Sequence, residues 1–342
     1  MIKRLIGGWV GASLAFGAAR AEAPVKFEEV FGLVRSNLTS VSDAELSKAA
    51  TLGLIEKLNG KVELTDPSNG KSAGSLIAKT NVFDSSFAYV RLDRVGPGIG
   101  QQLSDAMASA PKAKGVVLDL RFARGDDYNA VAEAVNLFVG EEKPVIKWGD
   151  HVAQTSARSQ VIDLPLVVLI NQQTRGAAEA LAGALRDQQI GLLIGRRTAG
   201  QAIVFNDFAL SSGQHLKIAR DKVALPGGKE IGTDGFAPDI SVEADEKNER
   251  RWLEDPYLTI LKPGTPSASA PFLTSVTNRV RRPTSAEVAR RHRELQEEEG
   301  AEQPRPADLP PPKVVQDAAL ARGLDFLKGL TVSRARENGK SR

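Results

Sequence analysis

Short apolar runs bounded by polar turns alternate with amphipathic segments through the middle of the chain. Leu166–Ile170 is one such run, and residues 192–194 form a second. Between them, small residues at helical spacing predict a helix from about Gly176 to Arg186. Apolar runs that alternate with helices are typical of parallel strands covered on both faces. The segment from 165 to 201 therefore predicts a strand, helix, strand unit of an α/β fold.

The same patterns predict further elements on either side of this unit. Strands are expected at residues 87–92, 115–121 and 144–148, followed by a hairpin of 203–210 and 215–219. Helices are expected within 27–58, where a second helix begins near Ser42, and at 100–110, 131–139 and 317–329. In the helix at 100–110 we expect Leu103, Met107 and Ala108 to face inward. Residues after 329 are expected to be disordered.

The first residues have the pattern of an export signal. Lys3 and Arg4 precede a short apolar run, and Ala21-Glu22-Ala23 is a small-residue cleavage site. The alternative is a membrane helix, but the run is shorter than the roughly 20 residues that span a bilayer. We therefore predict cleavage after Ala23 and a periplasmic or secreted product with no stable membrane insertion.

Composition excludes several kinds of chemistry. The chain has no cysteine, so it has no disulfide, thiol nucleophile or Cys-based metal site. Its three histidines show no metal-ligand spacing, and the formal net charge of +3 comes from interspersed charges, which does not favour nucleic acid. We expect neither a metal nor a cofactor.

A family resemblance rests on the order of small motifs around the predicted helix. Glu179, the run 182–185 (Ala-Gly-Ala-Leu), Asp187, Thr198 and Gly200 keep an order and spacing that resemble the tail-specific, or C-terminal processing, peptidases. The predicted strand 115–121 is similar to a strand of that family, because it ends in Val-Val-Leu-Asp-Leu-Arg. The resemblance covers about 87–242 and implies a crotonase-like β/α spiral core.

The residues that would carry the family's chemistry differ. The resemblance puts the catalytic serine at Gly176 and the general-base lysine at Gln201. A hydroxyl attacks only when a base removes its proton, and neither group is present here. The family's glycine-rich loop corresponds to residues 122–126, where Gly125 is kept and Asp126 replaces a glycine. We therefore predict no catalytic residue, and vestigial site positions at Gly176, Gln201, Asp187 and Gly125.

Four other polar residues have a structural interpretation, and for one of them, Thr174, a catalytic alternative stays open. Thr174, on the turn before Gly176, is the candidate relocated nucleophile, although a turn hydroxyl more often bonds local backbone. Asp119 and Arg121 are most simply a structural pair at a strand end. His215 lies in an alternating strand and is expected at the surface.

These observations divide the chain into segments and suggest a role. The predicted organisation is a signal peptide (1–23), N-terminal helices (24–60), a connector (61–86), the peptidase-like core (87–243), and a linker-rich tail (244–342) with helices near 286–299 and 317–329. The resemblance implies a peptide-reading PDZ domain where the connector stands, and so short a segment cannot enclose a core of its own.

The hypothesis is an exported pseudo-peptidase that binds a polypeptide segment or scaffolds an active peptidase paralogue, with oligomers possible. The alternative is an active serine-type endopeptidase with relocated groups.

Overall fold

The computed structural model describes residues 25–58, 60–66, 75–260 and 314–340. The chain forms two compact units, residues 1–64 and 65–342. The predicted signal peptide, the linkers and the helix near 286–299 lie outside the described residues. Among the described helices, none combines the length and apolarity needed to cross a bilayer.

The first unit contains the two helices predicted between 27 and 58. Helix α1 is Phe27–Asn37 and α2 is Asp43–Lys57, while strand β1 (Val62–Thr65) spans the boundary between the two units in the chain. The α2 N-terminus is a capping box, in which Ser42 and Glu45 satisfy each other's backbone N–H groups. Neither helix has a buried residue, and Phe27 in α1 is 63% exposed. The apolar face of α1 is thus open.

The second unit is built on a mostly parallel sheet, which confirms the mixed α/β prediction. Its strand order is β11-β8-β7-β4-β3-β2. Strands β3, β4, β7 and β8 run parallel, β11 joins β8 in parallel, and β2 pairs with β3 in antiparallel fashion. Their bounds are β2 Ile77–Phe83, β3 Phe87–Leu92, β4 Gly115–Asp119, β7 Leu166–Ile170, β8 Gly191–Gly195 and β11 Ile240–Ser241.

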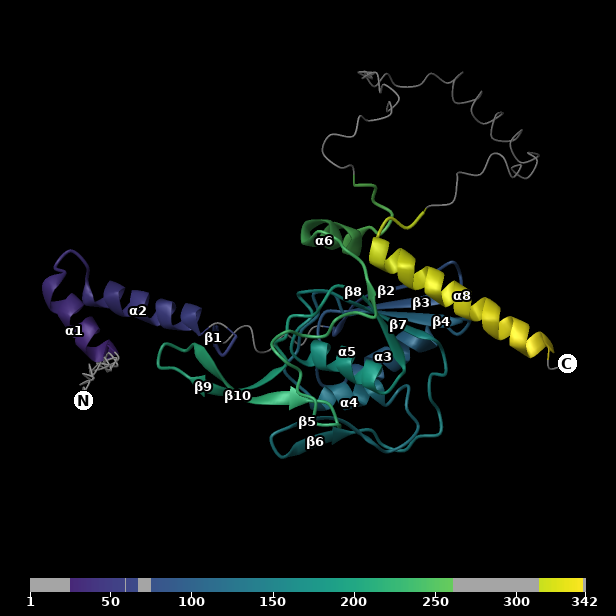
Figure 1. Cartoon of the computed structure of the whole chain (residues 1–342), viewed down its shortest axis with the longest axis horizontal. Helices are drawn as coiled ribbons and strands as arrows, with labels where there is room; N and C mark the ends of the chain where they lie inside the picture. Colours follow the sequence, from purple (N-terminus) through teal and green to yellow (C-terminus); the bar gives the residue numbers. More distant parts are fainter. Residues whose placement is uncertain (1–24, 59, 67–74, 261–313, 341–342) are drawn as a thin grey trace, which may run out of the picture. The chain divides into compact units, whose positions relative to one another are not determined.

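Helices cover both faces of this sheet (Figure 1). Alternate strand residues such as Leu118 and Val168 pack in one core with α3 (Ile99–Ala108), α4 (Asn129–Val135) and α5 (Ala177–Asp187). Their neighbours Val117 and Val167 point to the other face, where they pack with Leu320 and Leu324 of α8 (Ala318–Lys340). The unbroken apolar runs of the sequence reflect this double coverage.

A second, antiparallel sheet contains the predicted hairpin. Its strands include β9 (Ile203–Ala209), β10 (His215–Ala224), β5 (Pro144–Trp148) and β6 (His151–Gln154), with β10 between β9 and β5. β10 runs on beyond residue 219, past a bulge between Ala219 and Asp221. Only residues 215–219 of β10 alternate clearly between apolar and polar in the sequence, which explains why the predicted strand is shorter.

Four details differ from the predictions. Ala108 is exposed, because it lies about 140° around the helix from Leu103. The helix predicted for 131–139 is α4, which ends at Val135. The charged helix α6 (Glu246–Glu254) was not predicted. α8 continues to Lys340, so the expected disorder after 329 is wrong for residues 330–340.

Candidate functional site

Three loops that follow parallel strands meet at one edge of the main sheet. They are residues 120–128 after β4, 171–176 after β7, and 196–202 after β8. Backbone bonds join them: Arg175 N–H donates to the Ala123 carbonyl (3.1 Å), and Ala199 N–H donates to the Thr174 carbonyl (3.0 Å). The carboxyl ends of parallel strands are the usual position for a site in an α/β sheet.

The structure brings most predicted site positions together at this edge. Gly125, Thr174, Gly176 and the loop that carries Gln201 lie on the three joined loops. Asp187 does not join them, because it is exposed at the last residue of α5 while Gly176 caps the first turn.

Gly176 has a conformation and surroundings that strongly disfavour a side chain. Its φ is 61° and its ψ is −133°, a region that L-residues rarely occupy. A Cβ atom built here would lie 2.1 Å from the Gly125 carbonyl oxygen. A side chain at 176 would therefore require movement of the 122–126 loop.

Gly125 is equally restricted. Its φ is 151°, and a Cβ atom would lie 2.2 Å from the Val95 carbonyl oxygen. Val95 N–H donates to the Arg124 carbonyl (2.7 Å), and Arg124 N–H donates to the Asp93 carbonyl (3.2 Å). The backbone of residues 123–125 thus runs between residues 93–95 on one side and 175–177 on the other.

The Thr174 hydroxyl is fully engaged in holding the turn. It donates to the Leu120 carbonyl (2.9 Å) and accepts the Asn171 N–H (3.0 Å), and the residue is 0% exposed. This arrangement matches the local-bond interpretation made from the sequence. The partners of this hydroxyl are the Leu120 carbonyl, the Asn171 N–H and the Asn171 side-chain oxygen (3.4 Å), and none of the three is a base that accepts a proton near neutral pH.

Glu179 holds the loop that carries Gln201. Its buried carboxylate accepts the Thr198 hydroxyl and the N–H groups of Gly200 and Gln201, each N–H at 2.7 Å. Burial raises the pKa of Glu179, although these hydrogen bonds oppose the shift. The sequence indicated Glu179 as a framework position but not which groups it binds.

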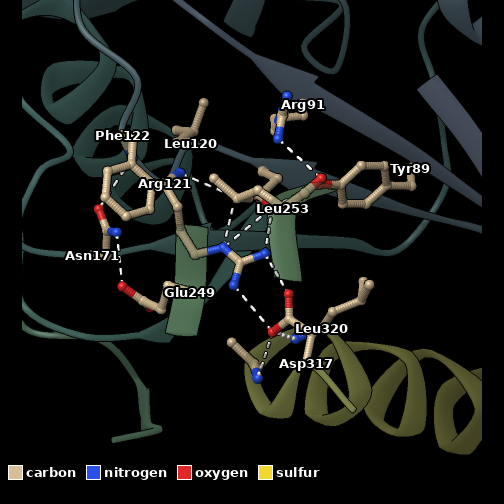
Figure 2. A network of polar contacts seen from close by, with 12 residues as sticks. Tyr89, Arg91, Leu120, Arg121, Phe122, Asn171, Glu249, Leu253, Asp317 and Leu320 are labelled. Atoms are coloured by element: carbon tan, nitrogen blue, oxygen red, sulfur yellow. Dashed lines mark hydrogen bonds and ion pairs between the residues drawn. The ribbon is translucent and has the colours of Figure 1, made fainter. Parts of the chain in front are cut away.

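A buried ion network surrounds Arg121, just after the end of β4 and directly before the 122–126 loop in the chain (Figure 2). The Arg121 guanidinium donates to Asp119 (2.6 Å) and to Asp317 (2.7 Å), while the Tyr89 hydroxyl donates to Asp119 (2.8 Å). Burial lowers the pKa of Arg121, but the two carboxylates outweigh it and raise the pKa well above its ordinary value. The predicted Asp119–Arg121 pair is thus confirmed as structural.

Asp317 was not predicted as part of this network. It also accepts the N–H groups of Ala319 and Leu320 (both 3.2 Å) and so caps α8. An acidic residue directly before Ala-Ala-Leu is a helix-start signal, but its ion partner is 196 residues away in the chain.

A second polar chain ties α6 to the turn before Gly176 (Figure 2). Asn171 donates its side-chain N–H to Glu249 (3.0 Å) and accepts the Phe122 N–H (3.1 Å). Phe122 has a φ of 63°, and the Arg250 guanidinium lies 4.1 Å from its ring centroid. Burial raises the pKa of Glu249. Within the described residues, no group of three or more acidic or histidine side chains is placed to hold a metal ion.

One residue of the hairpin forms an ion pair with the 122–126 loop. Lys217 of β10 forms an ion pair with Asp126 (2.8 Å). His215 Nδ1 lies 2.7 Å from the Asp207 carboxylate at the surface, where the sequence predicted it. The charge of Asp126 is therefore balanced from β10.

Comparison with known proteins relates the core segment to one family. Residues 86–242 match the family described as Peptidase family S41. A carboxyl-terminal-processing protease of Synechocystis sp. is 32% identical over 163 residues, 46% of this chain and 38% of the relative. The protein of the same description from Picosynechococcus sp. is 28% identical over 187 residues, 53% of this chain and 42% of the relative.

Among solved structures, the photosystem II D1 C-terminal processing protease has a TM-score of 0.42 and 24% identity, with 53% of this chain and 47% of that chain covered. The chain spans about two fifths of the length of the curated relatives it matches.

Proposed function

Because residues 86–242 relate this chain to peptidase family S41 and its C-terminal processing proteases, we propose that it is a pseudo-peptidase of that group. In this proposal the core is a crotonase-like β/α spiral that keeps the family's framework but lacks its catalytic serine and lysine. It holds an extended polypeptide and does not cut it.

The observation that carries the proposal is the geometry of Gly176. The resemblance puts the attacking serine at this position, where a Cβ atom would lie 2.1 Å from a backbone oxygen. Neither a serine nor any other nucleophilic side chain fits the present backbone.

Gln201 and Thr174 do not supply a substitute pair. Gln201 has an amide that accepts no proton near neutral pH. The Thr174 hydroxyl is buried and bonded to the Leu120 carbonyl. Loss of a nucleophile or a base in a serine protease costs roughly a million-fold in turnover. We therefore expect no hydrolysis.

Strand β9 supports a polypeptide-binding role. It begins two residues after Gln201, and in the described part of the chain it pairs with β10 alone. Leu210 N–H donates to the Gln214 carbonyl (2.8 Å), so by antiparallel alternation the backbone groups of Phe205, Asp207 and Ala209 point away from β10. An added strand requires such a row of outward N–H and C=O groups.

The side chains of the hairpin indicate which pattern of side chains the bound polypeptide has. Phe208 and Ile218 share one face and are 48% and 39% exposed. The opposite face carries Asp207 and Lys217. We expect a preference for extended segments that alternate apolar and polar residues.

Peptide binding to β9 is tested by removing one outward N–H. Asp207→Pro deletes a donor that would face the added strand, while Asp207→Ala keeps it. The probe is a fluorescein-labelled ten-residue peptide of alternating Val and Thr, followed by fluorescence anisotropy. We expect at least about tenfold weaker binding in the proline variant, with the alanine variant close to the parent.

Equal affinities in the two variants, or no binding by the parent chain, would contradict this role. An intact peptidase that co-purifies with the chain would instead favour a subunit that scaffolds an active paralogue.

Export and domain organisation belong to the same proposal. A signal peptide at 1–23 predicts a mature chain that begins at Pro24, which intact-mass spectrometry of the exported protein measures. The connector at 61–86 in place of a peptide-reading domain predicts no selection for free peptide C-termini. Amidation of the test peptide should then leave its affinity unchanged.

A further inference from the structure

The first N–H group of α5 already has an acceptor. Ala177 N–H donates to the Gly125 carbonyl oxygen at 2.8 Å. In acyl-transfer sites on a strand-to-helix turn, the N–H of the residue after the nucleophile stabilises the developing oxyanion. Ala177 follows Gly176, where the resemblance puts the serine, so the N–H that would bind such an anion already donates to a carbonyl of the chain itself.

The segment that delivers this carbonyl is held on both sides. Arg124 bonds to the backbone of Asp93 and Val95, while Ala123 and Gly125 accept N–H groups from Arg175 and Ala177. The bonds from Val95 and Ala177 are the shortest of the four, at 2.7 and 2.8 Å. Rotation of the Gly125 carbonyl away from α5 breaks the Ala177 bond and strains the rest.

An ion pair ties the next residue to the hairpin. The Asp126 carboxylate is 2.8 Å from Lys217 Nζ, and the two side chains are 75% and 24% exposed. Asp126 directly follows Gly125, so the ion pair restrains the segment that carries the Gly125 carbonyl. The ion pair therefore favours the loop position in which the Gly125 carbonyl accepts the Ala177 N–H.

We propose that residues 123–126 form an autoinhibitory plug, in which the Gly125 carbonyl blocks the anion-binding end of α5 and the Asp126–Lys217 pair holds it there. The inference rests on the proposed function, since it explains the inactive site at the level of the backbone. It goes further, because side-chain replacement alone then fails to rebuild the site. A serine at 176 would meet the Gly125 oxygen at 2.1 Å.

Amide hydrogen exchange of the full chain tests the contact directly. We expect Ala177 N–H to exchange at least about 100-fold more slowly than an unprotected amide, as does Ala180 N–H, which bonds to the Gly176 carbonyl (3.0 Å) inside the helix. Fast exchange at Ala177 with slow exchange at Ala180 would overturn the plug.

The latch is tested with two matched lysine variants on β10. Lys217→Ala removes the partner of Asp126, whereas Lys222→Ala removes an ion pair with Glu230 (2.9 Å) that involves no residue of the 122–126 loop. An ion pair of this kind predicts about 1.4- to 5-fold faster exchange at Ala177 in the first variant only. Equal exchange rates in the two variants would exclude the Asp126–Lys217 pair as a latch.

Reaction with a fluorophosphonate probe tests the consequence. The Gly176→Ser, Gln201→Lys double variant should form no adduct by mass spectrometry, although it restores both side chains. An adduct on a folded double variant overturns the inference. If the double variant does not fold, the exchange measurement on the parent chain decides.

The outcomes separate this inference from the proposed function. Peptide hydrolysis by the parent chain contradicts the pseudo-peptidase proposal whatever the exchange rate of Ala177. An inactive parent chain with an unprotected Ala177 amide contradicts only the plug.

Discussion

The restricted geometry of Gly176 gives a quantitative prediction for a single methyl group. Gly176→Ala adds a Cβ atom 2.1 Å from the Gly125 oxygen, at a φ of +61°. The matched control is Gly213→Ala in the hairpin turn, which has a φ of +83° but no atom within 4 Å of the added Cβ. Both variants impose a positive φ on alanine, and only the first also has a steric clash.

The expected magnitudes follow from these two terms. Backbone strain of this kind costs about 1–3 kcal/mol, and overpacking against a fixed neighbour adds about 1–3 kcal/mol. Gly176→Ala should therefore lose roughly 2–6 kcal/mol of the 5–15 kcal/mol that stabilise an ordinary protein. Gly213→Ala has the conformational term alone, about 1–2 kcal/mol.

Thermal unfolding followed by circular dichroism measures the difference. At about 2–4 °C per kcal/mol for a unit of this size, Gly176→Ala should lower Tm by about 5–20 °C. Gly213→Ala should lower it by about 2–8 °C in the same buffer. If the two variants have the same Tm, the backbone around Gly176 moves at little cost in stability, and the steric argument against a nucleophile there is wrong.

Four further predictions concern the network and the two units. Asp317→Asn leaves buried Arg121 with one carboxylate and should cost up to about 3–5 kcal/mol, measured by urea unfolding. Burial raises the pKa of Glu249 above its ordinary value of 4.5, so the protonated carboxyl favours the folded chain. This contribution to stability is lost as pH rises through the folded-state pKa. Tm should thus fall less between pH 4.5 and 7 in Glu249→Gln. Thr174→Val should cost about 1–3 kcal/mol in the same unfolding assay and leave peptide turnover at background. Phe27→Glu places a charge on the open face of α1 and should lower the mass seen by light scattering if that face joins two copies.

The sequence predicted those parts of the fold that follow from local periodicity. Strand β7 and residues 116–118 of β4 are unbroken apolar runs because helices cover both faces of the sheet. Helix α5 was predicted within one residue at its ends, since its small residues recur at helical spacing. Helix α6 was missed because seven of its nine residues are charged or amide and only Trp252 and Leu253 are apolar.

The candidate site was predictable in its residue types and not in its bonds. The absence of a serine at 176 and a lysine at 201 is visible in the sequence. The direction of the Gly125 carbonyl cannot be predicted from the sequence, because the orientation of a peptide plane does not affect the pattern of apolar and polar side chains. Asp317 could be suspected as a helix cap, but a contact with Arg121 across 196 residues needs the folded chain.

Peptide hydrolysis by the parent chain is the measurement that bears most directly on the central claim. Purified protein is incubated with an unfolded protein substrate, and new termini are identified by mass spectrometry beside a heat-inactivated sample and Thr174→Ala. The account predicts no cleavage above the heat-inactivated sample for either protein. Cleavage by the parent chain that Thr174→Ala abolishes would contradict it.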